Sequence, residues 1–367
     1  MIDETLRRVL DDEGRATRPA PEAGDDDLRR IYRHMLMLRV MDGRLLSLQR
    51  QGRIGFYGLT TGQEAAVTGT AYALRPSDWV FPALRETGVS MWRGTTIHEV
   101  VCQLMGNSGD VLIGRQMPMH FSDRKVNSVA WSSVIGTQLV HAMGAAWAAK
   151  LMKTGDVMAG YIGDGGTSSS DFHAALNFAA VKQLPVVFVC QNNQWAISVP
   201  VTAQTASSSI AVKAVAYGMP GVRVDGNDVL AVIEVMREAV ERARSGGGPT
   251  FVEALTFRMG GHSSSDDPTR YRDPALVQEW ERRDPLARYG AWLRAKGLLT
   301  DADVEAWTAE TGEAISRAVT ESEALPPPPV ESLFADVYAQ MPPQLAEQMR
   351  HAVALGRGTA FEGAFPL

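Results

Sequence analysis

Residues 157–193, VMAGYIGDGGTSSSDFHAALNFAAVKQLPVVFVCQNN, decide the fold of this chain. Val157 to Ile162 is a short apolar run that ends in the turn Gly163-Asp164-Gly165-Gly166. Apolar residues then follow helical spacing from Asp171 to Lys182, and a β-branched run extends from Val186 to Cys190. Strand, glycine-rich turn, helix and strand make a βαβ unit, which predicts a right-handed crossover in a parallel sheet.

Elements of the same kind are expected on both sides of this unit. Towards the C-terminus, the pattern predicts strands at Gly221 to Val224 and Thr250 to Phe257, with a helix from Val229 to Arg244 between them. Towards the N-terminus, apolar spacing predicts a helix from Leu28 to Gln51, and the Ala/Gly-rich segment Leu139 to Lys150 fits a buried helix. The expected fold class is therefore α/β, with a mostly parallel central sheet flanked by helices.

The pattern divides the chain into three regions. Residues 1–27 are rich in Asp, Arg, Pro and Gly and are expected to form a mobile N-terminal arm. Residues 28–275 form the α/β domain, and residues 276–367 read as a polar, helical C-terminal extension. Within the domain a second helix is expected to start near Thr61, because Thr61 and Glu64 have the spacing of a capping box.

Composition narrows the class of protein. The chain has 367 residues, 45% hydrophobic and 21% charged, as in ordinary soluble proteins. Its net charge of −6 argues against nucleic-acid binding, which depends on basic surface. The acidic N-terminus lacks the layout of a signal peptide, and the longest apolar candidate, Leu139 to Leu151, is too short to span a membrane. We expect a cytoplasmic protein without membrane contact.

Polar residues follow both central strands, Gly163-Asp164-Gly165 after the first and Gln191-Asn192-Asn193 after the second. Ligands of open parallel sheets bind beyond the carboxyl ends of the strands. One carboxylate and one amide oxygen suit Mg²⁺ completed by phosphate oxygens, and the glycines let the backbone approach a diphosphate. A P-loop is absent, and Ser168 stands where a dinucleotide fingerprint needs glycine.

The order and separation of Gly163-Asp164-Gly165 and Asn192-Asn193 are those of the thiamine diphosphate-binding motif. The surrounding sequence GDGGTSSSDFHAALNFAAVKQLPVVFVCQNNQWAIS resembles the alpha subunit of the decarboxylating first component of 2-oxo acid dehydrogenase complexes. The resemblance extends from about Arg30 to about Arg350, nearly the whole chain. It implies that residues 28–275 are a thiamine diphosphate-binding domain.

The resemblance implies a role for residues at matching positions. Asp164 and Asn193 match magnesium side-chain ligands, and Trp195 stands where a tyrosine donates its backbone carbonyl to the metal. Arg85 matches an arginine that pairs with the diphosphate, and Gly165 and Gly166 match positions that contact the cofactor through their backbone. Ser133 and Ile135 match positions around the aminopyrimidine and thiazolium rings. Gln191 stands where some members carry a basic ligand of the diphosphate. Ser132, Thr137 and Gln138 match a potassium site that some members have.

Two histidines match active-site positions in the family. His262, in GGHSSSDD, matches a loop histidine near the diphosphate and the reacting centre, and His120, in GRQMPMH, matches a histidine that positions the substrate. Ser133 is included with them as a candidate catalytic residue. Ser263 falls where mitochondrial relatives are phosphorylated, but we predict no regulation from a serine-rich loop. The sequence departs from the family pattern at three places that concern cofactor contacts. Leu84 replaces a tyrosine, Gln191 replaces a basic residue found in some members, and Ser169-Ser170 replaces Glu-Gly.

The resemblance further implies that the chain is half of an active site. The family places the glutamate that faces the pyrimidine ring on a separate beta subunit, so we expect an α₂β₂ heterotetramer that is active only when complete. The acyl group is then expected to pass to a lipoyl group of the acyltransferase component.

Substrate choice rests on shorter segments. RQGRIGFYG and GRQMPMHF look closer to branched-chain 2-oxo acid dehydrogenases than to pyruvate or acetoin enzymes, and Phe56 matches an aromatic residue of their acyl pocket. Phe56 is equally explained as core packing. The alternatives to a branched-chain enzyme are the alpha subunit of a pyruvate or acetoin dehydrogenase and a catalytically silent scaffold subunit.

Overall fold

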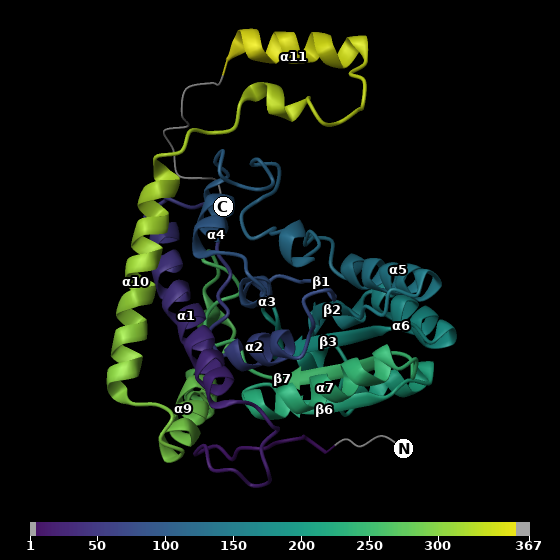
Figure 1. Ribbon diagram of the computed structural model, residues 1–367, viewed down its shortest axis with the longest axis vertical. Coiled ribbons are helices and arrows are strands. Elements are labelled where there is room, and N and C mark those ends of the chain that lie inside the picture. Colours follow the sequence, from purple (N-terminus) through teal and green to yellow (C-terminus); the bar gives the residue numbers. More distant parts are fainter. Residues whose placement is uncertain (1–4, 357–367) are drawn as a thin grey trace.

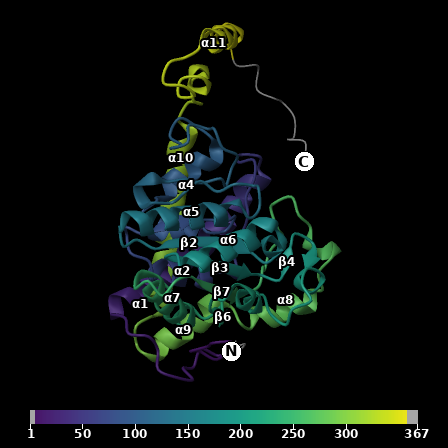
Figure 2. The same ribbon diagram turned by 90° about the vertical axis from the view of Figure 1, so that its right-hand side faces the viewer.

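The computed structural model describes residues 5–356. Its centre is a parallel sheet in the order β1-β2-β3-β7-β6, with helices on both faces (Figures 1 and 2). The strands are β1 Trp79–Phe81, β2 Met158–Gly163, β3 Val186–Asn192, β7 Thr250–Leu255 and β6 Gly221–Asp225. A separate antiparallel pair joins β4 Trp195–Ala196 to β5 Val199–Pro200.

The helices of the described residues fall into three groups along the chain. Those before the βαβ unit are α1 Asp25–Arg50, α2 Glu64–Tyr72, α3 Thr87–Trp92, α4 Ile97–Met105 and α5 Thr137–Met152. Within the sheet region lie α6 Ser170–Lys182 and α7 Val229–Arg244. The C-terminal group is α8 Pro274–Glu281, α9 Pro285–Ala295, α10 Asp301–Glu323 and α11 Pro343–Leu355.

The sheet is buried on both faces, and side chains alternate between two cores. Val187 and Val189 of β3 pack in the core formed with α1, α2 and α7. Phe188 and Cys190 of the same strand pack in the core formed with α5 and α6. This double burial explains why the strands read in the sequence as continuous apolar runs rather than as alternating ones.

The predicted βαβ unit is confirmed. β2 and β3 are parallel neighbours, joined through α6, and Gly163 at the end of β2 is in register with Gln191 near the end of β3. The turn after β2 continues as a short 3-10 helix, η2 Gly165–Ser168, before Ser169 caps α6. The carboxyl ends of the two central strands therefore meet at one edge of the sheet.

The predicted capping box at Thr61 is wrong, because a buried carboxylate from another helix binds Thr61 instead. The Asp42 carboxylate in α1 accepts hydrogen bonds from the backbone N–H and the hydroxyl of Thr61, both at 2.6 Å. Arg39 donates to Glu64, so neither member of the expected box caps the other. α2 starts three residues later, at Glu64, with Gln63 as an N-cap whose side chain makes no capping hydrogen bond.

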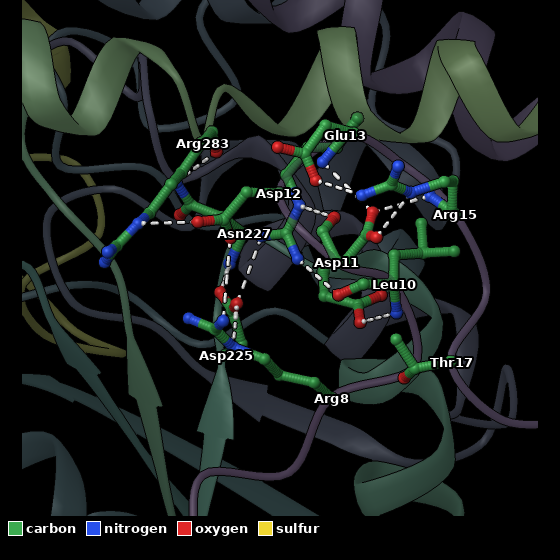
Figure 3. A network of polar contacts seen from close by, with 12 residues as sticks. Arg8, Leu10, Asp11, Asp12, Glu13, Arg15, Thr17, Asp225, Asn227 and Arg283 are labelled. Carbon is green, nitrogen blue, oxygen red and sulfur yellow. Dashed lines mark hydrogen bonds and ion pairs between the residues drawn. The ribbon is translucent and has the colours of Figure 1, made fainter.

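The expectation of a mobile arm over residues 1–27 does not hold for its described part, residues 5–24, which packs on the domain. Val9 and Leu10 are fully buried, and their backbone N–H groups donate to the Asp228 carboxylate at 2.6 and 2.7 Å. Around them Arg8 pairs with Asp225 at 2.9 Å and Arg283 with Asp12 at 3.3 Å (Figure 3). Periodicity missed this segment because these partners are long-range. Residues 1–4 lie outside the described part.

The predicted boundary at residue 275 does not mark the end of the core. Tyr289 and Leu293 of α9, and Ile315 of α10, are buried in the same core as α1. α10 runs beside α1 (Figure 1). Only the segment beyond α10 stands clear of the body (Figures 1 and 2). α11 buries none of its residues within the chain. Residues 357–367, the end of the predicted extension, lie outside the described part.

His34 of α1 makes the fold sensitive to acid. Its Nε2–H donates to the Gly88 carbonyl at 2.9 Å, and burial, opposed by that bond, lowers the pKa of His34 from 6.5 to about 4. A histidine kept neutral in the folded state contributes stability above pH 6.5, and the contribution is lost as the pH falls towards 4. We expect the free energy of unfolding to drop by about 2 kcal/mol between pH 7 and pH 5 on account of this group.

Urea unfolding at pH 7 and pH 5 measures this change. His34→Gln, whose amide can still donate to Gly88, is expected to show a smaller drop. His351→Gln, at an exposed position of α11, is the matched control and should retain the full pH dependence. Equal pH dependence in His34→Gln and the natural chain would exclude His34 as its source.

Candidate active site

A cavity of about 1120 Å³ opens at the carboxyl ends of β2 and β3. Turns and loops from the whole length of the domain line it, including the segments after β2 and β3 and the loop after β7. It gathers most of the residues singled out in the sequence: Phe56, Arg85, His120, Ser133, Ile135, Gln138, Asp164, Gly165, Gly166, Gln191, Asn193, Trp195 and His262. Ser132 and Thr137 are not among its lining residues.

The predicted metal ligands Asp164 and Asn193 are both buried at this edge of the sheet. The Asp164 carboxylate accepts a hydrogen bond from the Gln204 amide at 3.1 Å, and burial raises its pKa to about 6. The Asn193 Oδ1 accepts from the Trp195 N–H at 3.3 Å. The Trp195 carbonyl accepts from Arg258 at 3.1 Å, which leaves its second lone pair for another partner.

Arg85 is a buried guanidinium at the end of the turn before α3, 5% exposed. It donates to the backbone carbonyl of His262 at 2.7 Å and to that of Leu59. Burial, together with the nearby Arg258, lowers the pKa of Arg85 to about 10. A cation whose bonds go to neutral carbonyls in a buried cavity suits an anionic ligand.

His262 lies in the loop after β7 and is held by its backbone. Its N–H donates to Asp266 at 2.6 Å, while its carbonyl accepts from Arg85. Burial and the charges of Arg85 and Arg258 lower the pKa of its imidazole to about 4. The ring is therefore neutral at physiological pH and can act as a hydrogen-bond acceptor or donor beside the anionic site.

His120 and Ser133 meet on another wall of the cavity. The His120 Nε2 lies 2.6 Å from the Ser133 hydroxyl, and Nδ1 lies 3.1 Å from the Pro118 carbonyl. Because a carbonyl can only accept, Nδ1 carries the proton in the neutral ring and Nε2 accepts from Ser133. The Trp131 ring packs against the imidazole with centroids 4.0 Å apart.

The glycines after β2 allow close packing around the turn. A Cβ at Gly165 would meet the Ala196 Cβ at 2.4 Å, and one at Gly166 would meet the Ile162 side chain at 2.5 Å. A Cβ at Gly163 would meet nothing within 4 Å. The turn is therefore pressed against its neighbours at Gly165 and Gly166 and open at Gly163.

Sequence reasoning missed an arginine that organises the His262 loop. Arg258 is fully buried and donates to the Ile197 carbonyl at 2.6 Å and to the Tyr271 hydroxyl at 2.7 Å. Tyr271 in turn donates to Asp266, the carboxylate that binds the His262 N–H. The signal available in the sequence was a charged residue placed just beyond a buried strand.

A buried carboxyl group in the cavity was also missed. Glu86 is 2% exposed, and one of its oxygens accepts from the Gln191 amide. Burial, opposed by backbone hydrogen bonds and by Arg85, raises the pKa of Glu86 to about 7. Gln191 is thus tied to Glu86 by its nitrogen, while its Oε1 is buried without a hydrogen-bond partner in the described part of the chain.

The three residues matched to a potassium site bond in different directions. Ser132 accepts from the Val134 N–H, and Thr137 donates to Asp171 at 3.4 Å. Gln138 donates to the Tyr161 carbonyl at 2.9 Å. The structure therefore brings Gln138 to the cavity but does not show the three converging on one point.

The residues at the sheet edge fit a magnesium ion and a diphosphate. Asp164 has a buried carboxylate whose hydrogen-bond partner is a neutral amide. Its pKa is raised because burial disfavours the charged form, and a bound cation would stabilise that charge. Arg85 offers the converse, a buried cation bonded to neutral carbonyls. Fold and site together define an α/β chain in which one side of a large cavity has the side chains that suit a cation and a diphosphate.

Comparison with known proteins gives the family. The description "Dehydrogenase E1 component" applies to the family that matches residues 32–331, and the chain belongs to this family. Members are thiamine diphosphate-dependent 2-oxo acid dehydrogenase components, and this chain is of the alpha-subunit type.

Three relatives show how far the similarity extends. The 2-oxoisovalerate dehydrogenase subunit alpha 2 of Arabidopsis thaliana is 41% identical over 344 residues, 93% of this chain and 73% of that protein. The 3-methyl-2-oxobutanoate dehydrogenase subunit alpha of Mycobacterium tuberculosis is 44% identical over 93% of this chain and 91% of its own length. The pyruvate dehydrogenase E1 component subunit alpha of Bacillus cereus is 40% identical over 94% of this chain and 91% of its own. Among residues 5–356, none of the helices could span a membrane.

Proposed function

We propose that this chain is the alpha subunit of a branched-chain 2-oxo acid dehydrogenase. With a beta subunit, it would decarboxylate the 2-oxo acid on thiamine diphosphate and pass the acyl group to a lipoyl group of the acyltransferase component. The observation that carries the proposal is one cavity that joins the Asp164–Asn193 pair, Arg85 and the His120–Ser133 pair. Two of the relatives described above are named for branched-chain substrates.

The cofactor end of the cavity is proposed to hold Mg²⁺ and the diphosphate. Asp164, Asn193 and the Trp195 carbonyl would bind the metal, and Arg85 would pair with the diphosphate. Gly165 and Gly166 would contact the diphosphate through their backbone, with Gln191 and the neutral His262 at its edge. Ser133 and Ile135 would lie against the ring end of the cofactor. When bound, thiamine diphosphate supplies the carbanion equivalent and the electron sink for decarboxylation. A potassium ion at Ser132, Thr137 and Gln138 stays a prediction.

The apolar part of the cavity lining is proposed to hold the acyl chain. Ile54, Phe56, Met105, Met117 and Trp131 line it. His120, held by Ser133, would help to position the substrate beside the cofactor. An apolar pocket of this kind favours a branched aliphatic acyl group over a methyl group, since each added methylene contributes about 1–3 kcal/mol.

Steady-state rates of the reconstituted αβ enzyme with 3-methyl-2-oxobutanoate and with pyruvate test the substrate. We expect kcat/KM to favour the branched substrate by at least about 10-fold, on the scale of one or two methylenes. The Bacillus cereus relative is named for pyruvate, so the reverse preference is a specific alternative. It would overturn the branched-chain assignment and leave the cofactor site intact.

Arg85→Gln tests the proposed diphosphate contact. Loss of the buried cation should weaken thiamine diphosphate binding by about 30- to 5000-fold, corresponding to about 2–5 kcal/mol for a charge pair. Calorimetry on the αβ protein with Mg²⁺ measures it. Arg93→Gln is the matched control, because Arg93 is also an arginine that donates to backbone carbonyls, among them that of Val126 at 2.9 Å, but lies outside the cavity. A similar loss of affinity in both variants would contradict a specific role for Arg85.

The surface of α5 and α6 supports the proposed beta subunit and the α₂β₂ assembly. Trp147 and Leu151 of α5 and Val181 of α6 are 42%, 70% and 70% exposed, and the Trp147 ring packs on Phe178 of the adjacent helix. At the mouth of the cavity Ile135 is 50% exposed. Exposed apolar side chains along these helices and at the cavity lining are suited to a partner chain that would complete the site.

A catalytically silent scaffold is the remaining alternative. The departure at Ser169 has a structural account, because Ser169 accepts from the Phe172 N–H at 3.3 Å and caps α6, whereas no contact in the described part of the chain explains Ser170. Leu84 packs on Gly58 at the cavity wall. Calorimetry with Mg²⁺ and thiamine diphosphate on the αβ protein distinguishes the two: absence of binding would favour the scaffold.

A further inference from the structure

The turn that carries His120 is held by a buried side chain from α4. Gln103 is 2% exposed, and its amide nitrogen donates to the Met117 carbonyl at 2.8 Å. Its amide oxygen accepts from the Met119 N–H at 3.0 Å. Both hydrogen-bonding groups of one side chain are therefore used on the backbone of a single turn, on the two sides of Pro118.

This turn has a backbone conformation that needs support. Met119 has φ of 71°, in the left-handed region that non-glycine residues rarely adopt. Its side chain is 3% exposed and packs in the core. A strained backbone conformation persists only where contacts with the surrounding structure stabilise it. Here the Gln103 amide supplies two such polar contacts, to the backbone of Met117 and of Met119.

The same turn sets the direction of the His120 ring. The His120 N–H donates to the Met117 carbonyl at 3.1 Å, and Nδ1 donates to the Pro118 carbonyl at 3.1 Å. With Nδ1 bound in this way, Nε2 faces Ser133 and the cavity. The atoms that fix the ring thus belong to residues 117 and 118, and Gln103 binds the first of them directly.

We propose that Gln103 is a positioning residue that acts through His120. It would hold the 117–120 turn so that His120 keeps its protonated Nδ1 and keeps Nε2 at Ser133, on the wall of the cavity in which the substrate is proposed to bind. The inference rests on the proposed function, because it assigns Gln103 an effect on the step for which His120 is used. It predicts that Gln103 affects turnover only while His120 is present.

A double-mutant cycle on the reconstituted αβ enzyme tests this coupling. Gln103→Met keeps the length and volume of the side chain but removes both hydrogen bonds. With 3-methyl-2-oxobutanoate, we expect kcat to fall by about 10- to 100-fold, as for other residues that orient an active-site ligand. Thiamine diphosphate affinity, measured by calorimetry, is expected to stay within about twofold, because no contact of Gln103 reaches Asp164 or Arg85.

In the His120→Ala background the same Gln103→Met change is expected to alter kcat by less than about twofold, because there is no ring left to position. An equal fall in both backgrounds would overturn the inference and reduce Gln103 to a structural residue. Should His120→Ala alone leave kcat unchanged, the proposed role of His120 would fail instead, so the two failures are distinguishable.

Asn107→Ala is the matched control for general loosening of this region. Asn107 is also a buried amide near the end of α4, but it binds the Gly109 N–H and the Ser322 carbonyl, away from His120. It should lower stability in urea without coupling to His120→Ala. If Gln103→Met does not fold, Gln103→Asn replaces it in the cycle, since its shorter amide cannot span both partners. Coupling of Asn107→Ala as strong as that of Gln103 would also contradict the proposal.

Discussion

Purified without a beta subunit, this chain is expected to turn over 2-oxo acids at less than about 10⁻⁴ of the rate of the αβ enzyme. The resemblance to the family puts the glutamate that faces the aminopyrimidine on the beta subunit, and a positioned proton-transfer group alone contributes about 10²- to 10⁴-fold. The proposed partner would also cover Ile135, which lines the cavity and is 50% exposed in this chain. Activity should return as the beta subunit is titrated in and saturate at equal amounts.

Trp147→Glu tests the surface through which this assembly is proposed to form. A charge on the apolar face of α5 and α6 should weaken association, so that more beta subunit is needed for half-maximal activity while the saturated rate is retained. Size-exclusion chromatography with light scattering follows assembly independently. Full turnover by the purified chain alone would refute the half-site proposal, and an α₂β₂ assembly unaffected by Trp147→Glu would place the interface elsewhere.

Asp164→Asn is the substitution expected to harm cofactor binding most. The amide keeps the shape of the side chain but removes the charge that would bind Mg²⁺, an effect of several kcal/mol, or about 10³-fold in affinity. The apo protein is expected to gain stability at neutral pH, because the folded state no longer buries an uncompensated carboxylate whose pKa is raised to about 6. Loss of binding with unchanged or improved apo stability separates a ligand role from a folding role.

Asp156→Asn is the matched control for Asp164→Asn. Asp156 lies just before β2, at the opposite end of the strand from Asp164, and outside the cavity. Calorimetry with Mg²⁺ and thiamine diphosphate should give the affinity of the natural chain for this variant. Retention of tight Mg²⁺-dependent binding by Asp164→Asn would exclude Asp164 as a ligand of the metal.

Part of the fold could be predicted because its signals are local. The helix Val229–Arg244 was predicted with the bounds that the structure shows, and its apolar spacing and Asp228 cap lie within the segment itself. β1 was not predicted, since three residues are too few for a periodic pattern. The spacing of Thr61 and Glu64 is that of a capping box, but no box forms because Thr61 binds Asp42, a residue 19 positions away in sequence.

The candidate site shows the same division. The Asp164–Asn193 pair was predictable because both follow strands of one βαβ unit, whose register places Gly163 beside Gln191. Glu86 and Gln103 carried no local signal, because each acts through partners from other elements. Arg258 stood out only as a charged residue just beyond a buried strand, which does not reveal its partners Trp195, Ile197 and Tyr271. Their roles became visible only where burial and hydrogen-bond partners were known.

The sequence by itself therefore determined the βαβ unit, the sheet edge where a cation and a diphosphate would bind, and the family resemblance. Only the tertiary structure decided how that edge becomes a site. Arg85 reaches the His262 carbonyl across 177 residues, and Val9 and Leu10 reach Asp228 across more than 200. Such contacts depend on how whole elements pack and on which buried polar groups need partners, and neither is encoded in the spacing of neighbouring residues.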